Sequence, residues 1–172
     1  NNSGSGIRFQ SAASTIKDNI IVDNNQWGIQ INGRSANDID NVVANNTVLR
    51  NNDGIRLYKQ DSVLLENTVN NNNRYGVAID TSSSLYLWNN TITNNDDYDI
   101  VLTTGSSVFS TGNAFSSVSV SSNSILTVKS YIDLRVTNAL GLNASGIDIR
   151  IKEDDSVKYS TEMILAFSSR YA

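Results

Sequence analysis

The 172-residue chain contains no cysteine, no histidine and no proline. Without cysteine, disulfide bonds and thiolate metal sites are excluded. Without histidine, the chain lacks both the most frequent general base and the most frequent metal ligand of proteins. A chain without proline is consistent with short strands joined by tight turns of asparagine, glycine and serine. These absences favour an all-β chain and exclude histidine-dependent chemistry.

Basic residues are few and scattered. The chain has 13 Lys and Arg against 17 Asp and Glu, a net charge of −4 at pH 7 and an isoelectric point near 4.7. Nucleic-acid phosphates require clustered basic side chains, so we expect no nucleic-acid partner. No apolar run approaches the roughly 18 residues of a membrane span, so none is predicted. The chain opens at Asn1, inside a repeat-like phrase and not at Met, which favours a mature or excerpted chain.

One short phrase recurs five times along the first two thirds of the chain. Its copies begin at Gly6, Gly28, Gly54, Gly76 and Asp99, at steps of 22, 26, 22 and 23 residues. The first and third residues after each start are apolar and the second varies, which is the pattern of a strand with one buried face. A fixed period of this length predicts stacked coils. Two interior rows are expected, namely Ile7, Ile29, Ile55, Val77 and Ile100, and Phe9, Ile31, Leu57, Ile79 and Leu102.

Asparagines mark two corners of each coil. One set precedes short apolar strands at Asn19, Asn46, Asn67, Asn90 and Asn113. Asparagine tolerates the left-handed conformation of a corner, and stacked amides can hydrogen-bond from coil to coil. Asparagine pairs at 24–25, 51–52, 72–73 and 94–95 indicate the second corner, and weaker strands at 63–65, 85–87 and 107–109 give three strands per coil. The serine-rich segment 116–124 is interpreted as an irregular last coil or a link.

The pattern G-I-x-[IL], N-x-[IV] and N-N at 28–52, 54–73 and 76–95 resembles the right-handed parallel β-helix repeat proteins, a superfamily with pectate-lyase-like folds. The resemblance covers residues 1 to about 115 and implies coil geometry. It implies no single activity, because the superfamily includes lyases, hydrolases, epimerases, adhesins, tailspikes and surface-layer components. We expect an all-β fold: a right-handed parallel β-helix of about five coils, each of 22–26 residues, spanning residues 1–127.

The residue pattern changes after residue 127. Residues 131–137 and 147–151 alternate cleanly between apolar and polar side chains. Together with the intervening turn, they resemble the opening strands of an immunoglobulin-like β-sandwich, with Asn138 where that family has aspartate. Such a domain needs roughly 100 residues. We therefore expect residues 128–172 to form an incomplete antiparallel, immunoglobulin-like segment.

Aromatic side chains at strand starts are the candidate carbohydrate-binding residues. Trp27, Tyr75 and Tyr98 each precede a strand-opening position, and Tyr58 lies nearby in the sequence of the third copy. Coil stacking at about 4.8 Å would align the first three in a broken column. Flat rings in this arrangement suit stacking on sugar rings. The alternative is an ordinary aromatic ladder that packs over the corner.

Two carboxylates lie on the long loop 32–41, which contains the extra residues of the 26-residue coil. Asp38 and Asp40 are candidate ligands for a structural Ca²⁺, because this ion prefers oxygen ligands. Arg34 and Arg56 near them would suit a calcium-assisted lyase, whereas a solvated acidic loop is the simpler alternative. No other cofactor is expected.

Four N-x-[ST] sequons without proline are candidate glycosylation sites, at Asn1, Asn45, Asn89 and Asn143. Chance also produces such matches in a sequence rich in asparagine, serine and threonine.

The sequence favours a non-catalytic structural or adhesive protein of an extracellular surface, such as a surface-layer, filament or envelope component. Self-association or contact with neighbouring surface proteins is expected, and a polysaccharide is a further candidate partner. The first alternative is a polysaccharide-binding or polysaccharide-modifying β-helix protein of the lyase or hydrolase kind, supported by the aromatic column. The second alternative is a fibre like a phage tailspike.

Overall fold

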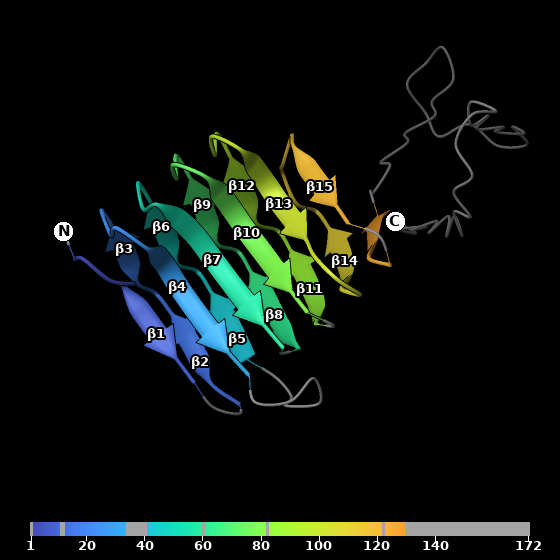
Figure 1. Cartoon of the computed structure of the whole chain (residues 1–172), viewed down its shortest axis with the longest axis horizontal. Helices are drawn as coiled ribbons and strands as arrows, with labels where there is room; N and C mark the ends of the chain where they lie inside the picture. Colours follow the sequence, from blue (N-terminus) through green and yellow to red (C-terminus); the bar gives the residue numbers. More distant parts are fainter. Residues whose placement is uncertain are drawn as a thin grey trace, which may run out of the picture. The chain divides into compact units, whose positions relative to one another are not determined.

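A computed structural model describes residues 2–10, 13–33, 41–59, 61–81, 83–121 and 123–129. These residues form sixteen β-strands and no helix, and thus contain no helix capable of crossing a membrane. The strands stack in three parallel sheets (Figure 1). The first sheet contains β1 (Ile7–Phe9), β4 (Trp27–Asn32), β7 (Asp53–Tyr58), β10 (Tyr75–Asp80), β13 (Tyr98–Leu102) and β15 (Val118–Val120).

The second and third sheets complete each coil. The second contains β2 (Thr15–Lys17), β5 (Asn41–Ala44), β8 (Ser62–Leu65), β11 (Ser84–Trp88), β14 (Ser107–Thr111) and β16 (Ile125–Lys129). The third contains β3 (Ile20–Val22), β6 (Thr47–Leu49), β9 (Thr68–Asn70) and β12 (Thr91–Thr93). Every strand pairs in parallel with its counterpart one coil away, which is the topology of a parallel β-solenoid.

The number of coils differs slightly from the five expected. Four coils carry all three strands. The fifth has β13 and β14 but only an isolated bridge, between Thr91 and Ala114, in place of a third-sheet strand. β15 and β16 then pair with β13 and β14, so the serine-rich segment continues the solenoid as an irregular coil. The expected boundary at 127/128 falls inside β16, and residues 130–172, with the expected immunoglobulin-like segment, lie outside the described residues.

The predicted interior rows are confirmed. Ile29, Ile55, Val77 and Ile100 are fully buried and paired in register through the first sheet. The second row is equally buried from Ile31 to Leu102, while Ile7 and Phe9 pack against the core partly exposed. Burying each such side chain stabilises the fold by roughly 1.5–3 kcal/mol. Stacking therefore assembles a continuous core from a thin apolar stripe in each coil.

Both asparagine corners form hydrogen-bonded ladders. The side-chain oxygen of Asn67 accepts from the backbone N–H and the amide of Asn46, and Asn67 donates in the same way to Asn90. The first ladder runs from Asn19 to Asn113, and the second runs through Asn24, Asn51, Asn72 and Asn95 to the carboxylate of Asp99. The coil-to-coil hydrogen bonding expected of asparagine is thereby confirmed.

The expected left-handed conformation lies one residue earlier than predicted. Positive φ angles occur at Asp18, Asn45, Glu66 and Asn89, each immediately before a ladder asparagine. The ladder residues themselves are absent from this set, because a side chain that bridges two coils must point inward from the following position. The last pair is also shifted by one: Asn95 continues the second ladder, whereas Asn94 has the positive φ.

Candidate functional site

The outward face of the first sheet carries the predicted aromatic column. Each strand-opening glycine leaves no room for a side chain, since a Cβ on Gly54 would lie 2.6 Å from Val69 Cγ1 inside the coil. The residues that precede the glycines differ in exposure: Trp27 and Tyr75 are half-buried, whereas Asp53 is buried. Strand register then aligns Trp27 with Asp53 and Tyr75 with Tyr98. The column is thus broken at Asp53, as predicted.

Arg56 joins two of the predicted binding residues. Its guanidinium carbon lies 5.7 Å from the centre of the Trp27 ring and 5.3 Å from that of Tyr58. Its Nε donates a 2.7 Å hydrogen bond to Asp80 Oδ2, while the Thr103 hydroxyl donates to Oδ1 at 2.9 Å. Cation–π contacts of this kind contribute about 0.5–1 kcal/mol at exposed sites. Arg56 therefore holds two rings from neighbouring coils in one rigid cluster.

A second charged cluster surrounds Asp53. This carboxylate is only 3% exposed, and its Oδ1 has no hydrogen-bond partner in the described part of the chain. Arg74 Nε lies 3.7 Å from that oxygen and 4.0 Å from Asp97 Oδ2, and the Arg74 guanidinium stacks over the Tyr75 ring at 4.6 Å. Burial raises the pKa of Asp53, and the charge of Arg74 and the amide of Asn52 only partly offset it. A buried carboxyl whose pKa is raised is a feature that clusters at functional sites.

The four predicted carbohydrate-binding residues thus all lie on or beside the first sheet. Trp27, Tyr58 and Tyr75 are half-buried, and Tyr98 is 42% exposed. Trp27 and Tyr58 both contact the guanidinium of Arg56, and Tyr75 pairs with Tyr98 in the register of neighbouring strands. Their binding of carbohydrate stays a prediction.

The candidate metal ligands Asp38 and Asp40, with Arg34, lie outside the described residues. Across the ranges that the structure describes, no cluster of three or more His, Cys, Asp or Glu side chains could hold a metal ion. A structural Ca²⁺ on the loop 32–41 therefore stays a prediction.

Two of the four sequons lie within the described residues. Asn45 and Asn89 are exposed and occupy the same corner, in two coils separated by one other. The Asn45 amide donates a 2.8 Å hydrogen bond to Asp18 Oδ1. Asn1 and Asn143 lie outside the described residues. Glycosylation stays a prediction at all four.

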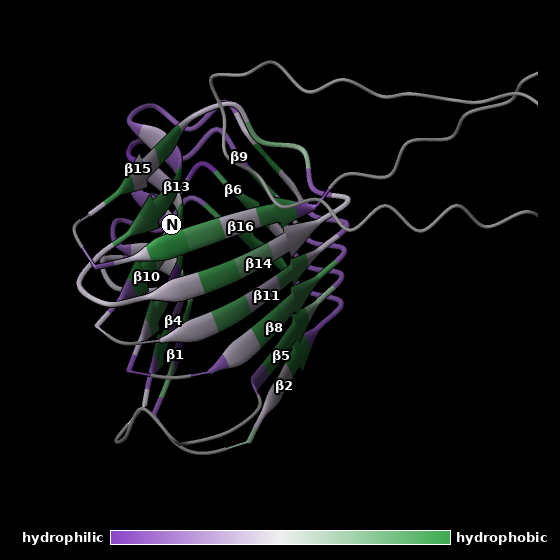
Figure 2. Ribbon diagram, turned by 90° about the vertical axis from the view of Figure 1, so that its right-hand side faces the viewer, coloured by the Kyte–Doolittle hydropathy of each residue, from purple (hydrophilic) through white to green (hydrophobic). Residues whose placement is uncertain are grey.

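Sequence reasoning missed a second group of exposed aromatic residues. Tyr86, Trp88 and Phe109 are 55%, 53% and 41% exposed on the outer face of the second sheet. The Tyr86 and Phe109 rings stack with centroids 5.3 Å apart and an interplanar angle of 14°. Figure 2 shows this sheet from outside. The alternation in the sequence could have revealed this group. Leu85 and Leu87 are apolar and alternate with Tyr86 and Trp88, so the two aromatic residues must lie on the opposite face of the strand.

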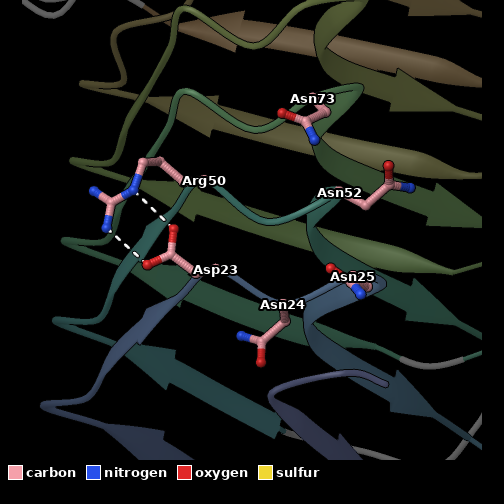
Figure 3. A pocket seen from close by; sticks show the side chains of 6 residues that line it. All are labelled: Asp23, Asn24, Asn25, Arg50, Asn52 and Asn73. Carbon is pink, nitrogen blue, oxygen red and sulfur yellow. Dashed lines mark hydrogen bonds and ion pairs between the residues drawn. The ribbon is translucent and has the colours of Figure 1, made fainter. Parts of the chain in front are cut away.

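A polar groove lies at the corner between the third and first sheets (Figure 3). Its volume is about 380 Å³. On one side, Arg50 donates two hydrogen bonds, of 2.9 and 3.0 Å, to the carboxylate of Asp23. Hydrogen bonding from Arg50 lowers the pKa of Asp23. The groove is lined by Asp23, Asn24, Asn25, Arg50, Asn52 and Asn73.

Comparison with known proteins identifies the fold family. The family model described as the right handed beta helix region matches residues 1–125 and again residues 43–153. The second match crosses the boundary expected at 127/128 and so lends no support to a separate immunoglobulin-like segment beginning there. Neither the curated proteins nor the solved structures yield a match. From the stacked parallel sheets and the family match over most of its length, the chain belongs to the right-handed β-helix family.

Proposed function

We propose that the chain is a non-catalytic structural or adhesive module of an extracellular surface. The observation that carries this proposal is the pair of asparagine ladders, which lock two corners of successive coils from Asn19 to Asn113 and from Asn24 to Asp99. Buried amides that are fully hydrogen-bonded make a rigid, specific scaffold. Neighbouring surface proteins or further copies of the chain are the proposed partners.

Location is the first test of this function. Immunogold electron microscopy of cells that make the protein should place the label on the outer surface or on extracellular filaments. Brief treatment of intact cells with a protease should remove the label. Label confined to the cell interior, and protected from the protease, would exclude the proposal.

Polysaccharide binding is the second candidate function, and the outward face of the first sheet specifically favours it. Trp27, Tyr58 and Tyr75 offer partly exposed rings, held in place by Arg56 and Arg74. Aromatic residues with an apolar body and fixed orientation are efficient binding anchors. Contact with a polysaccharide would also explain adhesion.

Binding to a glycan array tests this second function. Trp27→Ala should weaken the binding of a recognised glycan at least about fivefold, the effect of losing roughly 1 kcal/mol at an anchor residue. Trp88→Ala is the matched control, because Trp88 is an exposed tryptophan of the second sheet. Equal binding by wild type and Trp27→Ala, or a loss seen only with Trp88→Ala, would contradict a site on the first sheet.

A further inference from the structure

The polar groove joins three successive coils through asparagine amides. Asn25, Asn52 and Asn73 lie along one side of it and the Asp23–Arg50 pair along the other (Figure 3). The backbone N–H of Asn52 donates to the carbonyl of Asn24, and that of Asn73 donates to the carbonyl of Asn51. These bonds hold the corners of successive coils in register. Adjacent coils are about 4.8 Å apart. The groove therefore offers a repeating row of amides parallel to the axis of the solenoid.

Two of the amides that line the groove have free hydrogen-bonding groups. Asn24 is committed to the ladder, and the Asn52 amide donates to Asp53. Within the ranges that the structure describes, the exposed side chains of Asn25 and Asn73 make no hydrogen bond, so each offers two donors and an acceptor. Asp23 and Arg50 neutralise each other through their paired hydrogen bonds.

An aromatic residue follows each of the two free amides closely in the sequence. Trp27 follows Asn25 by two residues, and Tyr75 follows Asn73 by two residues. Both rings are partly exposed at the start of first-sheet strands. An amide row, with aromatic rings two residues farther along the chain, offers hydrogen bonds for hydroxyl groups and flat faces for sugar rings.

Charge selects among polysaccharides. Asp96 and Asp97 are exposed at the same corner in the next coil, where the Asp96 backbone N–H bonds to Asn72. Arg74 Nε lies 3.7 Å from Asp53 Oδ1 and 4.0 Å from Asp97 Oδ2, so one cation faces two carboxylates there, and Asp96 has no ion-pair partner among the described residues. The remaining negative charge repels an anionic chain.

We propose that the groove and the rings of Trp27 and Tyr75 form a binding site for a neutral oligosaccharide that runs parallel to the solenoid axis. Asn25 and Asn73 contact its hydroxyl groups. This inference rests on the second candidate function, polysaccharide binding, and adds the ligand class, the direction of the bound chain and the residues that bind it.

Isothermal titration calorimetry with the whole chain tests the site. The probes are neutral hexasaccharides of β-1,4-glucan, β-1,4-mannan and α-1,4-glucan, with an oligogalacturonate of the same length as the anionic probe. At least one neutral probe should bind and the anionic probe should not. Asn25→Ala and Asn73→Ala should each raise the Kd about fivefold, the effect of one lost hydrogen bond. Both residues are exposed and unpaired, so thermal unfolding should confirm an intact fold.

The control is Thr104→Ala, which alters an exposed residue of the turn after the first sheet and should leave the Kd unchanged. Neutral binding that depends on Trp27 but ignores both asparagines would overturn the groove and leave polysaccharide binding standing. Binding of the anionic probe alone would overturn the ligand class. If no neutral probe binds, the groove site fails, whereas the polysaccharide-binding function is decided separately by the glycan array with Trp27→Ala.

Discussion

At each corner, two consecutive residues have different roles. The residue with positive φ turns the chain, and Asp18, Asn45, Glu66 and Asn89 all fill this position although their side chains differ. The next residue must be asparagine, because its amide donates and accepts along the ladder while buried. Only the second task demands one residue type. That is why asparagine recurs regularly at the ladder and not at the turn.

Asp53 is the residue whose protonation should affect stability most visibly. Burial raises the pKa of its carboxyl in the folded chain, whereas the unfolded chain has the ordinary value of about 3.9. The carboxyl therefore favours the folded state below the unfolded pKa, and this contribution is lost as the pH rises through the folded pKa. We expect Asp53→Asn to be more stable than wild type at pH 7, by up to about 1 kcal/mol.

Urea unfolding of wild type and Asp53→Asn between pH 3 and pH 7 measures this effect. The difference between the two proteins should grow as the pH rises. A variant that is less stable at pH 7 would show that the ion pair with Arg74, at 3.7 Å, outweighs the cost of burial.

At the scale of the strand, the opening glycine determines how each first-sheet element packs. A Cβ on Gly54 would collide with the carbonyl oxygen of Gly76 and lie 2.6 Å from Val69 Cγ1. Backbone of the next coil cannot move away without breaking strand pairing. Glycine is thus required here by the close approach of two coils and not by a positive φ.

Gly54→Ala should therefore destabilise the fold by about 1–3 kcal/mol, as overpacking of a tight interior does. Gly4→Ala is the control, because a Cβ on Gly4 meets nothing within 4 Å. Thermal denaturation followed by circular dichroism compares the two. Equal melting temperatures would refute the steric account of the strand start.

The whole solenoid behaves as a one-dimensional stack, in which each coil contacts its neighbours. Ladder hydrogen bonds connect only successive coils: Asn67 bonds to Asn46 and Asn90, and Asn90 bonds to Asn113. Coupling between ladder residues should therefore fall off after one coil. Because each coil contacts only its neighbours, the residues on the outer faces can differ from coil to coil without disturbing the core.

A pair of double-mutant cycles tests this reach. Asn67→Ala with Asn90→Ala should show a coupling energy of about 0.5–3 kcal/mol, because each removes a partner of the other. Asn46→Ala with Asn113→Ala, two coils farther apart, should add to within about 0.5 kcal/mol. Strong coupling in the distant pair, measured by urea unfolding, would contradict a nearest-neighbour stack.

The sequence alone determined the coil period, the two interior rows, the three strands of each coil, the asparagine ladder from Asn19 to Asn113 and the position of the second asparagine corner. These features are readable because strand alternation and ladder spacing are local patterns that every coil repeats. The five-coil count was less accurate, because the fifth coil reduces its third strand to one bridge at Ala114.

Only the tertiary structure decided what the coils place side by side. Two residues separate Asn24 from Trp27, but one separates Asn51 from Asp53, so corner length changes which side chains meet. The burial of Asp53, the contact of Arg56 with Trp27 and Tyr58, and the polar groove all depend on that register. Contacts between coils join residues more than 20 positions apart, and they depend on how the coils stack. The local sequence pattern therefore does not predict them.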